Sequence, residues 1–298
     1  MLRTLSDALR PQALLEFELP AAPQRIEELA APQAGGEAVR VHAPAGGMLL
    51  LLSTDGPLTL AFEATLFELL AGARYPAAKP RRTRTGSLLA QLHGPTGPAA
   101  ATCYTWPSGD AVRPEDASFA QHLEAGRLLA RLHLLGATHP ASVADPLDGA
   151  QLAARLPAGE PGEELRDVLQ PGLPGLPAGA VHGSFGPSHV LFAGERATAV
   201  MPSGVSCSAP LVVDLANALC AWALPLSRPQ PAMRAIVSGY QSLRRLPGEE
   251  RDALYPALRF AAARAGALLL LSGQVAQALA ALRGCEALGE PDVRAAAG

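Results

Sequence analysis

One short segment in the second half of the chain constrains its fold more than any other. It runs from Val181 to Phe192 and reads Val-His-Gly-Ser-Phe-Gly-Pro-Ser-His-Val-Leu-Phe. Apolar residues at both ends enclose a loop of Gly, Pro, Ser and His, a composition that favours short strands joined by turns. Ala193–Arg196 then reads as the polar turn of a hairpin that leads into a second apolar strand ending near Val200. The segment therefore predicts a polar loop held between strands.

This loop resembles the catalytic loop of the superfamily that contains aminoglycoside phosphotransferases, homoserine kinase type II and choline kinase. The resemblance implies a His-Gly-Asp sequence whose Asp deprotonates the substrate hydroxyl, then an Asn and a second Asp that bind magnesium. In this chain Ser184 stands at the first position, His189 at the second and Pro202 at the third. We therefore expect these three positions to be degenerate, with no intact catalytic residue and no metal ligand.

A shift of the alignment does not recover the missing acids. Between Asp167 and Asp214 the only carboxylate is Glu195, which lies in the predicted hairpin turn. Phosphoryl transfer depends on positioning and on neutralisation of charge, largely by metal ions. A serine is no base near neutral pH, a proline side chain binds no metal, and loss of a general base alone costs roughly 10²–10⁴-fold in rate.

The residues that bind the nucleotide in the family are also replaced in this chain. The family carries a lysine on the third strand of its N-terminal lobe, and the matching apolar strand has Leu52 there, or Leu51 if the register shifts. The only lysine of the chain, Lys79, lies beyond the next helix. Glu63 occupies the position of the glutamate that pairs with that lysine, although a solvated carboxylate on an amphipathic helix is the alternative. The resemblance thus implies a degenerate nucleotide site at Leu52 and Glu63.

Other segments keep the order and spacing of the same superfamily. Leu128–His133 resembles the long helix that precedes the catalytic loop, and Asp214-Leu215-Ala216 follows the loop at the expected distance. Gly239–Leu246 resembles part of the C-terminal helical hairpin of homoserine kinase type II. The resemblance implies that His182 packs structurally and that Asp214 supports the loop from below by accepting hydrogen bonds. Together these segments imply an α+β, two-lobed protein-kinase-like fold.

The predicted fold divides into an N-terminal lobe at residues 1–107 and a helical C-terminal lobe at residues 108–298. The N-terminal lobe has an antiparallel sheet and one helix, predicted at Thr59–Ala71, after a first segment of a short helix and linkers. Trp106–Gly109 is the predicted hinge, and a long helix follows from Asp116 to Leu135. We expect residues 286–298 to fray.

Composition limits the possible partners and compartments. The 298 residues are 49% apolar and carry a net charge of −3, enough for one or two cores but without a positive field for nucleic acid. The longest apolar run, Ala261–Leu271, is interrupted by Arg264 and is too short to cross a bilayer. The charged N-terminus reads as no secretory signal, and the widely spaced cysteines show no metal or redox motif. We therefore expect a cytoplasmic protein that binds neither nucleic acid nor membrane.

Three functions remain open from the sequence. The main hypothesis is a pseudokinase that acts as a binding or accessory subunit for a protein or peptide in a biosynthetic pathway, without a cofactor. The second is an enzyme of the same family with altered chemistry, for which a small-molecule ligand is possible. The third is a small-molecule or Ser/Thr kinase that uses ATP and magnesium through relocated catalytic residues.

Overall fold

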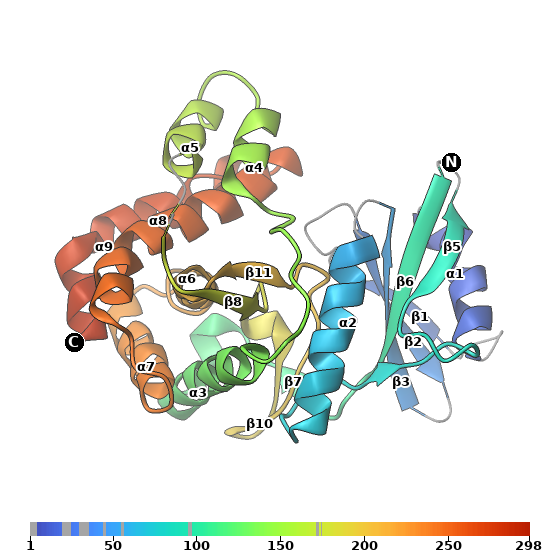
Figure 1. Ribbon diagram of the computed structural model, residues 1–298. Coiled ribbons are helices and arrows are strands. Elements are labelled where there is room, and N and C mark those ends of the chain that lie inside the picture. The colour runs from blue at the N-terminus through green and yellow to red at the C-terminus, as the bar shows by residue number, and fades with distance from the viewer. Residues whose placement is uncertain are drawn as a thin grey trace.

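Two lobes make up the protein, as the sequence predicted. The computed structural model describes residues 5–19, 25–29, 36–43, 46–54, 57–94, 97–170, 173 and 175–298. A sheet with flanking helices forms the N-terminal lobe, and helices around two small sheets form the C-terminal lobe (Figure 1). This is a two-lobed α+β fold of the protein-kinase-like type.

An antiparallel sheet organises the N-terminal lobe. Its strands run in the order β1-β2-β3-β6-β4, and β5 also pairs with β6. Their bounds are β1 (Arg25–Leu29), β2 (Gly36–Ala43), β3 (Gly46–Ser53), β4 (Pro80–Arg81), β5 (Ala90–Gly94) and β6 (Gly97–Thr105). β3 lies in the middle of the sheet, and its residues 48–53 are all buried because both faces of the sheet are covered.

Helices cover the two faces of this sheet. α1 (Leu5–Glu16) packs on one face, where Leu9 shares a core cluster with Leu52. α2 (Pro57–Gly72) packs on the other face, in the larger core that includes Leu51. Because successive side chains of a strand point to opposite faces, neighbouring leucines of β3 belong to different cores.

The C-terminal lobe places helices around two small antiparallel sheets. β7 (Asp110–Ala111), β9 (Val190–Ala193) and β10 (Arg196–Val200) form one sheet, and β8 (Ala178–Val181) pairs with β11 (Cys207–Pro210) in the other. The helices are α3 (Phe119–Gly136), α4 (Gly149–Arg155), α5 (Gly162–Leu169), α6 (Leu211–Trp222), α7 (Pro229–Gln241), α8 (Gly248–Leu271) and α9 (Ala280–Ala297). The loop between β8 and β9 faces the N-terminal lobe, so the fold itself positions the candidate site.

Three elements differ from the predicted ones. β1 pairs with β2 where the sequence indicated only linkers, and α4 precedes the predicted short helix α5. The C-terminal residues belong to α9 instead of fraying, because Val293 and Ala297 are buried. The Gln241 side chain also donates a hydrogen bond to the carbonyl oxygen of Ala297.

The segment Trp106–Gly109, which was predicted as the hinge, lies between β6 and β7. β6 ends at Thr105, and β7 begins at Asp110 and pairs with β9 of the C-terminal lobe. The lobe boundary at residue 107 stays a prediction.

Within the described residues, α8 is the one helix that is long and apolar enough to cross a membrane by length and composition alone. However, 56% of its most apolar window is buried inside the fold. A core helix shows burial of this kind, so the length and composition of α8 are only weak evidence for a membrane span.

Candidate active site

A cavity of about 450 Å³ lies between the two lobes. The strand β3 contributes Leu49 and Leu51 to its wall, and the segment between the lobes contributes Trp106. On the C-terminal side it is lined by Ser184, Gly186, Pro187, Ser188, His189, Met201, Pro202, Ser203, Val205 and Ala221. None of the described residues that line it is Asp, Glu, Lys or Arg, so its polar groups are hydroxyls, an imidazole and backbone.

The loop between β8 and β9 forms the floor of this cavity and requires a glycine at its turn. Gly183 has φ +80°, a conformation that side chains disfavour. A Cβ atom there would also lie 2.5 Å from the carbonyl oxygen of Val205. A short 3₁₀ turn at Pro187–His189 then leads the chain into β9. This geometry leaves Ser184 half-buried at the edge of the cavity.

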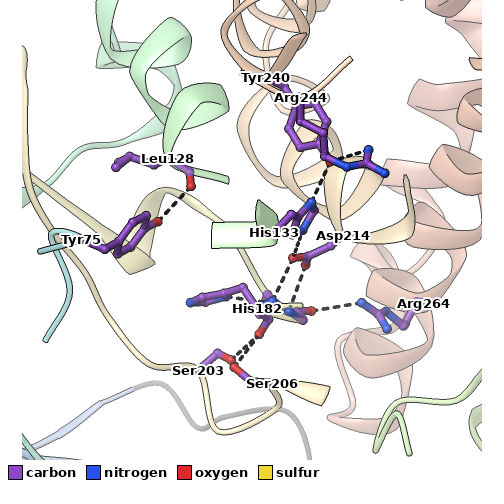
Figure 2. A network of polar contacts seen from close by, with 12 residues as sticks. Tyr75, Leu128, His133, His182, Ser203, Ser206, Asp214, Tyr240, Arg244 and Arg264 are labelled. Carbon is purple, nitrogen blue, oxygen red and sulfur yellow. Dashed lines mark hydrogen bonds and ion pairs between the residues drawn. The ribbon is translucent and has the colours of Figure 1, made fainter. Parts of the chain in front are cut away.

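Asp214 supports the loop from beneath. Its carboxylate accepts hydrogen bonds from the backbone N–H groups of His182 and Gly183, each at 2.9 Å, and lies 3.1 Å from Nε2 of His133 (Figure 2). Burial by itself would raise the pKa of Asp214, but the hydrogen bond and charge of His133 and the neighbouring His182 bring that pKa below its ordinary value. The first turn of α6 carries this carboxylate, a position where the helix dipole also favours negative charge.

A chain of hydrogen bonds extends from Asp214 through the C-terminal lobe to Glu250. Nδ1 of His133 lies 2.7 Å from the Tyr240 hydroxyl, which accepts a hydrogen bond of 3.0 Å from Arg244. Arg244 in turn binds both carboxylate oxygens of Glu250, at 2.7 and 2.9 Å. An ionised carboxylate only accepts hydrogen bonds, so the Nε2–H group of His133 donates to Asp214.

His182 has a structural role beneath the loop. It is fully buried, its Nε2 atom donates to the carbonyl oxygen of Met201 at 2.8 Å, and its Nδ1 atom accepts the backbone N–H of Ser184 at 3.3 Å. Its ring also packs edge-on against Phe185 and His189. Both ring nitrogens are therefore occupied by loop contacts.

The structure brings the three degenerate positions together at the cavity. Ser184, His189 and Pro202 all line it. Burial, and the neighbouring His182, lower the pKa of His189 to about 3, so its imidazole is neutral at physiological pH. Magnesium prefers oxygen ligands in octahedral geometry. An imidazole, a hydroxyl and a proline ring do not fit a magnesium ion held in the manner the resemblance implies, and the described residues contain no other cluster of metal ligands.

The predicted nucleotide-site residues need two corrections. Leu52 does not line the cavity, because its side chain belongs to the core beneath α1, whereas Leu51 does line it. Glu63 is not a solvated carboxylate but is fully buried. It accepts hydrogen bonds from the backbone N–H groups of Ser203 and Gly204 at 2.9 Å.

A second, smaller cavity of about 200 Å³ meets the first at Ser184 and Ala221, which line both. Its polar lining includes Asn217 of α6 and Arg264 of α8. Arg264 is 4% exposed and donates to Asp145 at 3.0 Å and to the carbonyl oxygen of Gly183 at 3.1 Å. Sequence reasoning treated Arg264 only as an interruption of an apolar run. A lone charge inside an apolar helix was the available signal, because such a residue is seldom buried without a specific partner.

The two-lobed fold and the position of the loop between β8 and β9 are those of kinase-like phosphotransferases. The profile of the phosphotransferase enzyme family (APH) matches residues 28–255, so the chain belongs to this family. Homoserine kinase of Caulobacter sp. (strain K31) is 32% identical over 229 residues, which cover 70% of this chain and 68% of that protein. Homoserine kinase of Gluconobacter oxydans (strain 621H) is 31% identical over 252 residues, or 74% and 78% of the two chains.

Solved structures share the fold over almost the whole chain. Amicoumacin kinase in complex with AMP-PNP, Ca²⁺ and Ami has a TM-score of 0.71 at 14% identity, and the match covers 95% of this chain and 93% of that one. The microcompartment-associated aminopropanol kinase has a TM-score of 0.67 at 16% identity, with 97% and 98% covered. At these identities the likeness concerns the fold alone.

The comparisons overturn two predictions made from the sequence. The relatives carry the name of a homoserine kinase, and the structural neighbours are kinases of amicoumacin and aminopropanol. All three are small molecules, so the pseudokinase and its protein or peptide partner were wrong. The expectation of no cofactor also lacks support, because the amicoumacin kinase holds an ATP analogue with a metal ion. The error arose because three changed residues were given more weight than the rest of the chain.

Proposed function

We propose that the protein is a phosphotransferase that transfers a phosphoryl group from ATP to a hydroxyl group of a small molecule, with catalytic residues that differ from the family pattern. The observation that carries this proposal is the junction of the two cavities at Ser184 and Ala221. Phosphoryl transfer requires a donor and an acceptor to meet in a fixed orientation. Two adjoining cavities, one of about 450 Å³ and one of about 200 Å³, supply separate places for the two ligands.

The larger cavity suits the nucleoside part of ATP. Leu49, Leu51 and Trp106 offer apolar and aromatic walls against which a purine can pack. Magnesium would neutralise the phosphates when bound with ATP. Because positions 184, 189 and 202 do not fit it as ligands, we assign no step to a metal held by them.

The smaller cavity suits an acceptor of about the size of an amino acid. Its volume lies below the range of roughly 300–1,000 Å³ that is usual for drug-sized ligands, which disfavours an antibiotic. The Arg264 guanidinium already binds Asp145 and Gly183, but it has five N–H groups, so it retains donors for a carboxylate on the acceptor. The Asn217 amide offers both a donor and an acceptor of hydrogen bonds. A small hydroxy amino acid fits these groups, and homoserine is the candidate that the curated relatives support.

The chain's own residues position the reacting groups in this proposal. The Ser184 hydroxyl can hydrogen-bond the acceptor hydroxyl at the junction of the cavities, and Asp214 fixes the loop that carries it. Ser184 replaces the carboxylate, and none of the described residues that line the two cavities is an Asp or Glu that could act as base at neutral pH. We therefore expect turnover slower by roughly 10²–10⁴-fold than in a relative that has an Asp there. The cytoplasmic location stays a prediction.

The test is direct formation of a phosphate ester. The purified protein is incubated with ATP, magnesium and, in separate samples, L-homoserine, L-threonine, L-serine or 1-amino-2-propanol, and products are followed by ³¹P NMR. We expect an ester of a hydroxy amino acid. Absence of an ester from every acceptor, at an enzyme concentration that would detect one turnover per hour, would refute the proposal.

A substitution in the smaller cavity assigns the acceptor. Asn217→Leu should raise the KM for the acceptor about tenfold or more, since it fills the cavity and removes a polar contact, and should leave the KM for ATP within about twofold. Gln277→Leu, an exposed position far from the loop in sequence, is the matched control for an added leucine. An equal change in both KM values would place the acceptor elsewhere.

A further inference from the structure

Glu63 makes an unusual contact between the two lobes. It lies on α2 in the N-terminal lobe, yet its hydrogen-bond partners among the described residues are N–H and O–H groups of the loop after β10. Ser203 N–H lies at 2.9 Å, Gly204 N–H at 2.9 and 3.0 Å from the two oxygens, and the Ser206 hydroxyl at 2.8 Å. Glu63 and Ser203 are 140 residues apart in the chain.

These contacts satisfy the charge of Glu63 without a basic partner. A carboxylate taken out of water is costly unless it is hydrogen-bonded, and hydrogen bonds to an ionised acceptor are roughly twice as strong as neutral ones. The resemblance implied a lysine partner on β3, but Leu51 lines the cavity there. The loop N–H groups replace that lysine as the partners of Glu63.

The same loop connects Glu63 to the floor of the cavity. Met201, Pro202 and Ser203 line the cavity. The hydroxyls of Ser203 and Ser206 also lie 2.9 and 3.2 Å from the carbonyl oxygen of His182 (Figure 2). Each hydroxyl has one proton, so the distances are best satisfied when Ser206 donates to Glu63 and Ser203 donates to His182.

A continuous polar path therefore runs from the N-terminal lobe to Ser184. It passes from Glu63 through Ser203 and Ser206 to His182. The Nδ1 atom of the His182 ring accepts the backbone N–H of Ser184, and the backbone N–H of His182 donates to Asp214. A movement of α2 would shift the loop and with it the hydroxyl at the junction of the two cavities. No other charged side chain of α2 is fully buried, since Glu68 is exposed and pairs with Arg82.

We propose that Glu63 is a positioning residue that fixes the N-terminal lobe, and hence the nucleotide, relative to Ser184 by holding the loop of residues 201–206. This role rests on the proposed phosphotransferase function. It accounts for a buried glutamate at a site whose usual basic partner is absent: the residue serves the geometry of the loop and not the charge of the nucleotide.

The experiment compares Glu63→Gln with Glu68→Gln on the same helix. Glutamine keeps the size of the side chain but replaces one acceptor oxygen by a donor that faces the loop N–H groups. At a temperature where circular dichroism shows both variants folded, we expect kcat of Glu63→Gln to fall about 10–100-fold. The KM for the hydroxyl acceptor should stay within about twofold, and Glu68→Gln should match the wild type. A fall in thermal stability with unchanged kcat would reduce Glu63 to a structural role and overturn the proposal.

A milder variant and a binding readout keep the test decisive. Ser206→Ala removes one hydrogen bond and should lower kcat in the same direction by a smaller factor, even if Glu63→Gln does not fold. If the wild-type protein forms no phosphate ester, the phosphotransferase function fails by itself. The role of Glu63 is then tested by ATP binding. In the Trp222→Phe protein, with and without Glu63→Gln, we measure the change in Trp106 fluorescence on addition of ATP. Loss of this change in folded Glu63→Gln supports positioning, and an unaltered change overturns it.

Discussion

At the scale of single residues, buried charges are tied to the loop that carries Ser184. Asp214 holds the loop backbone, and behind it His133, Tyr240 and Arg244 form a hydrogen-bonded chain (Figure 2). Arg244 in turn binds Glu250. Buried polar groups that are fully paired make a structure rigid, whereas an unpaired one is costly. The loop therefore owes its shape to groups that a ligand does not touch.

Asp214→Asn should lower the free energy of unfolding by about 3 kcal/mol at pH 7, because it removes one member of a buried pair. The folded pKa of Asp214 is depressed below its ordinary value of 3.8. Its contribution is therefore complete above that value and is lost as the pH falls through the folded pKa. Urea denaturation of both proteins should show a constant difference from pH 5 to 7 that narrows below about pH 4. Asp292→Asn, at an exposed position, is the control; a difference that widens on acidification would contradict this assignment.

Part of the site could be predicted from the residues and part could not. The resemblance to the phosphotransferase family supplied the positions of Ser184, His189 and Pro202. It also implied the role of Asp214 beneath the loop. Glu63 is 140 residues from its partner Ser203, and Arg264 lies 81 residues from Gly183. Contacts of this kind depend on how elements that are distant in the sequence pack together, for which a single sequence carries no periodic signal. The same limit misplaced Leu52, since a register error of one residue reverses the face of a strand.

At the scale of secondary-structure elements, glycines set the spacing of α3 and α7. A Cβ atom on Gly126 would lie 1.9 Å from the carbonyl oxygen of Ile236, and one on Gly239 would lie 2.0 Å from that of Leu123. Each glycine therefore lets the backbone of the other helix approach closely. His133 on α3 and Tyr240 on α7 are thereby held at hydrogen-bond distance.

Gly126→Ala should lower the free energy of unfolding by about 3 kcal/mol, since the added methyl group forces two helix backbones apart. Gly284→Ala in α9 is the matched control, because its Cβ atom would meet nothing within 4 Å. There the gain in helix propensity should raise stability by up to about 1 kcal/mol. Urea denaturation measures both values. Equal effects of the two substitutions would show that the close approach of α3 and α7 does not contribute to the free energy of unfolding.

Elements with local signals were predicted more closely than those without them. The amphipathic pattern placed α2 within two residues of its observed ends. α3 begins after Ser118, whose capping box with Gln121 satisfies the first backbone N–H groups of the helix. β1 lacks such a signal because it is short and its residues are half-buried or exposed. The end of α9 was predicted to fray because its burial comes from contacts with α7, far away in the sequence.

At the scale of the whole molecule, the two lobes share one hydrophobic core. The larger cluster contains Leu51 of the sheet and Leu219 of α6, whereas the cluster beneath α1 lies within the N-terminal lobe. Backbone contacts strengthen this junction: Val200 N–H donates to the carbonyl oxygen of Pro76 at 2.8 Å, and Ala78 N–H donates to that of Val200 at 2.9 Å. An interface that is continuous with the core opposes independent opening of the lobes.

We therefore expect the lobes to unfold in one cooperative transition. Two single-tryptophan variants report on them separately. Trp222→Phe leaves Trp106, which packs beneath Arg40 at 4.0 Å beside the sheet, and Trp106→Phe leaves Trp222, which is fully buried in the C-terminal lobe. In each variant the urea midpoint from fluorescence should coincide with that from circular dichroism, the usual test of a two-state transition. If the Trp106 signal changes at a lower urea concentration than the circular dichroism of the same variant, the lobes are independent. The shared core would then not couple them, and residues 1–107 would behave as a separate folding unit.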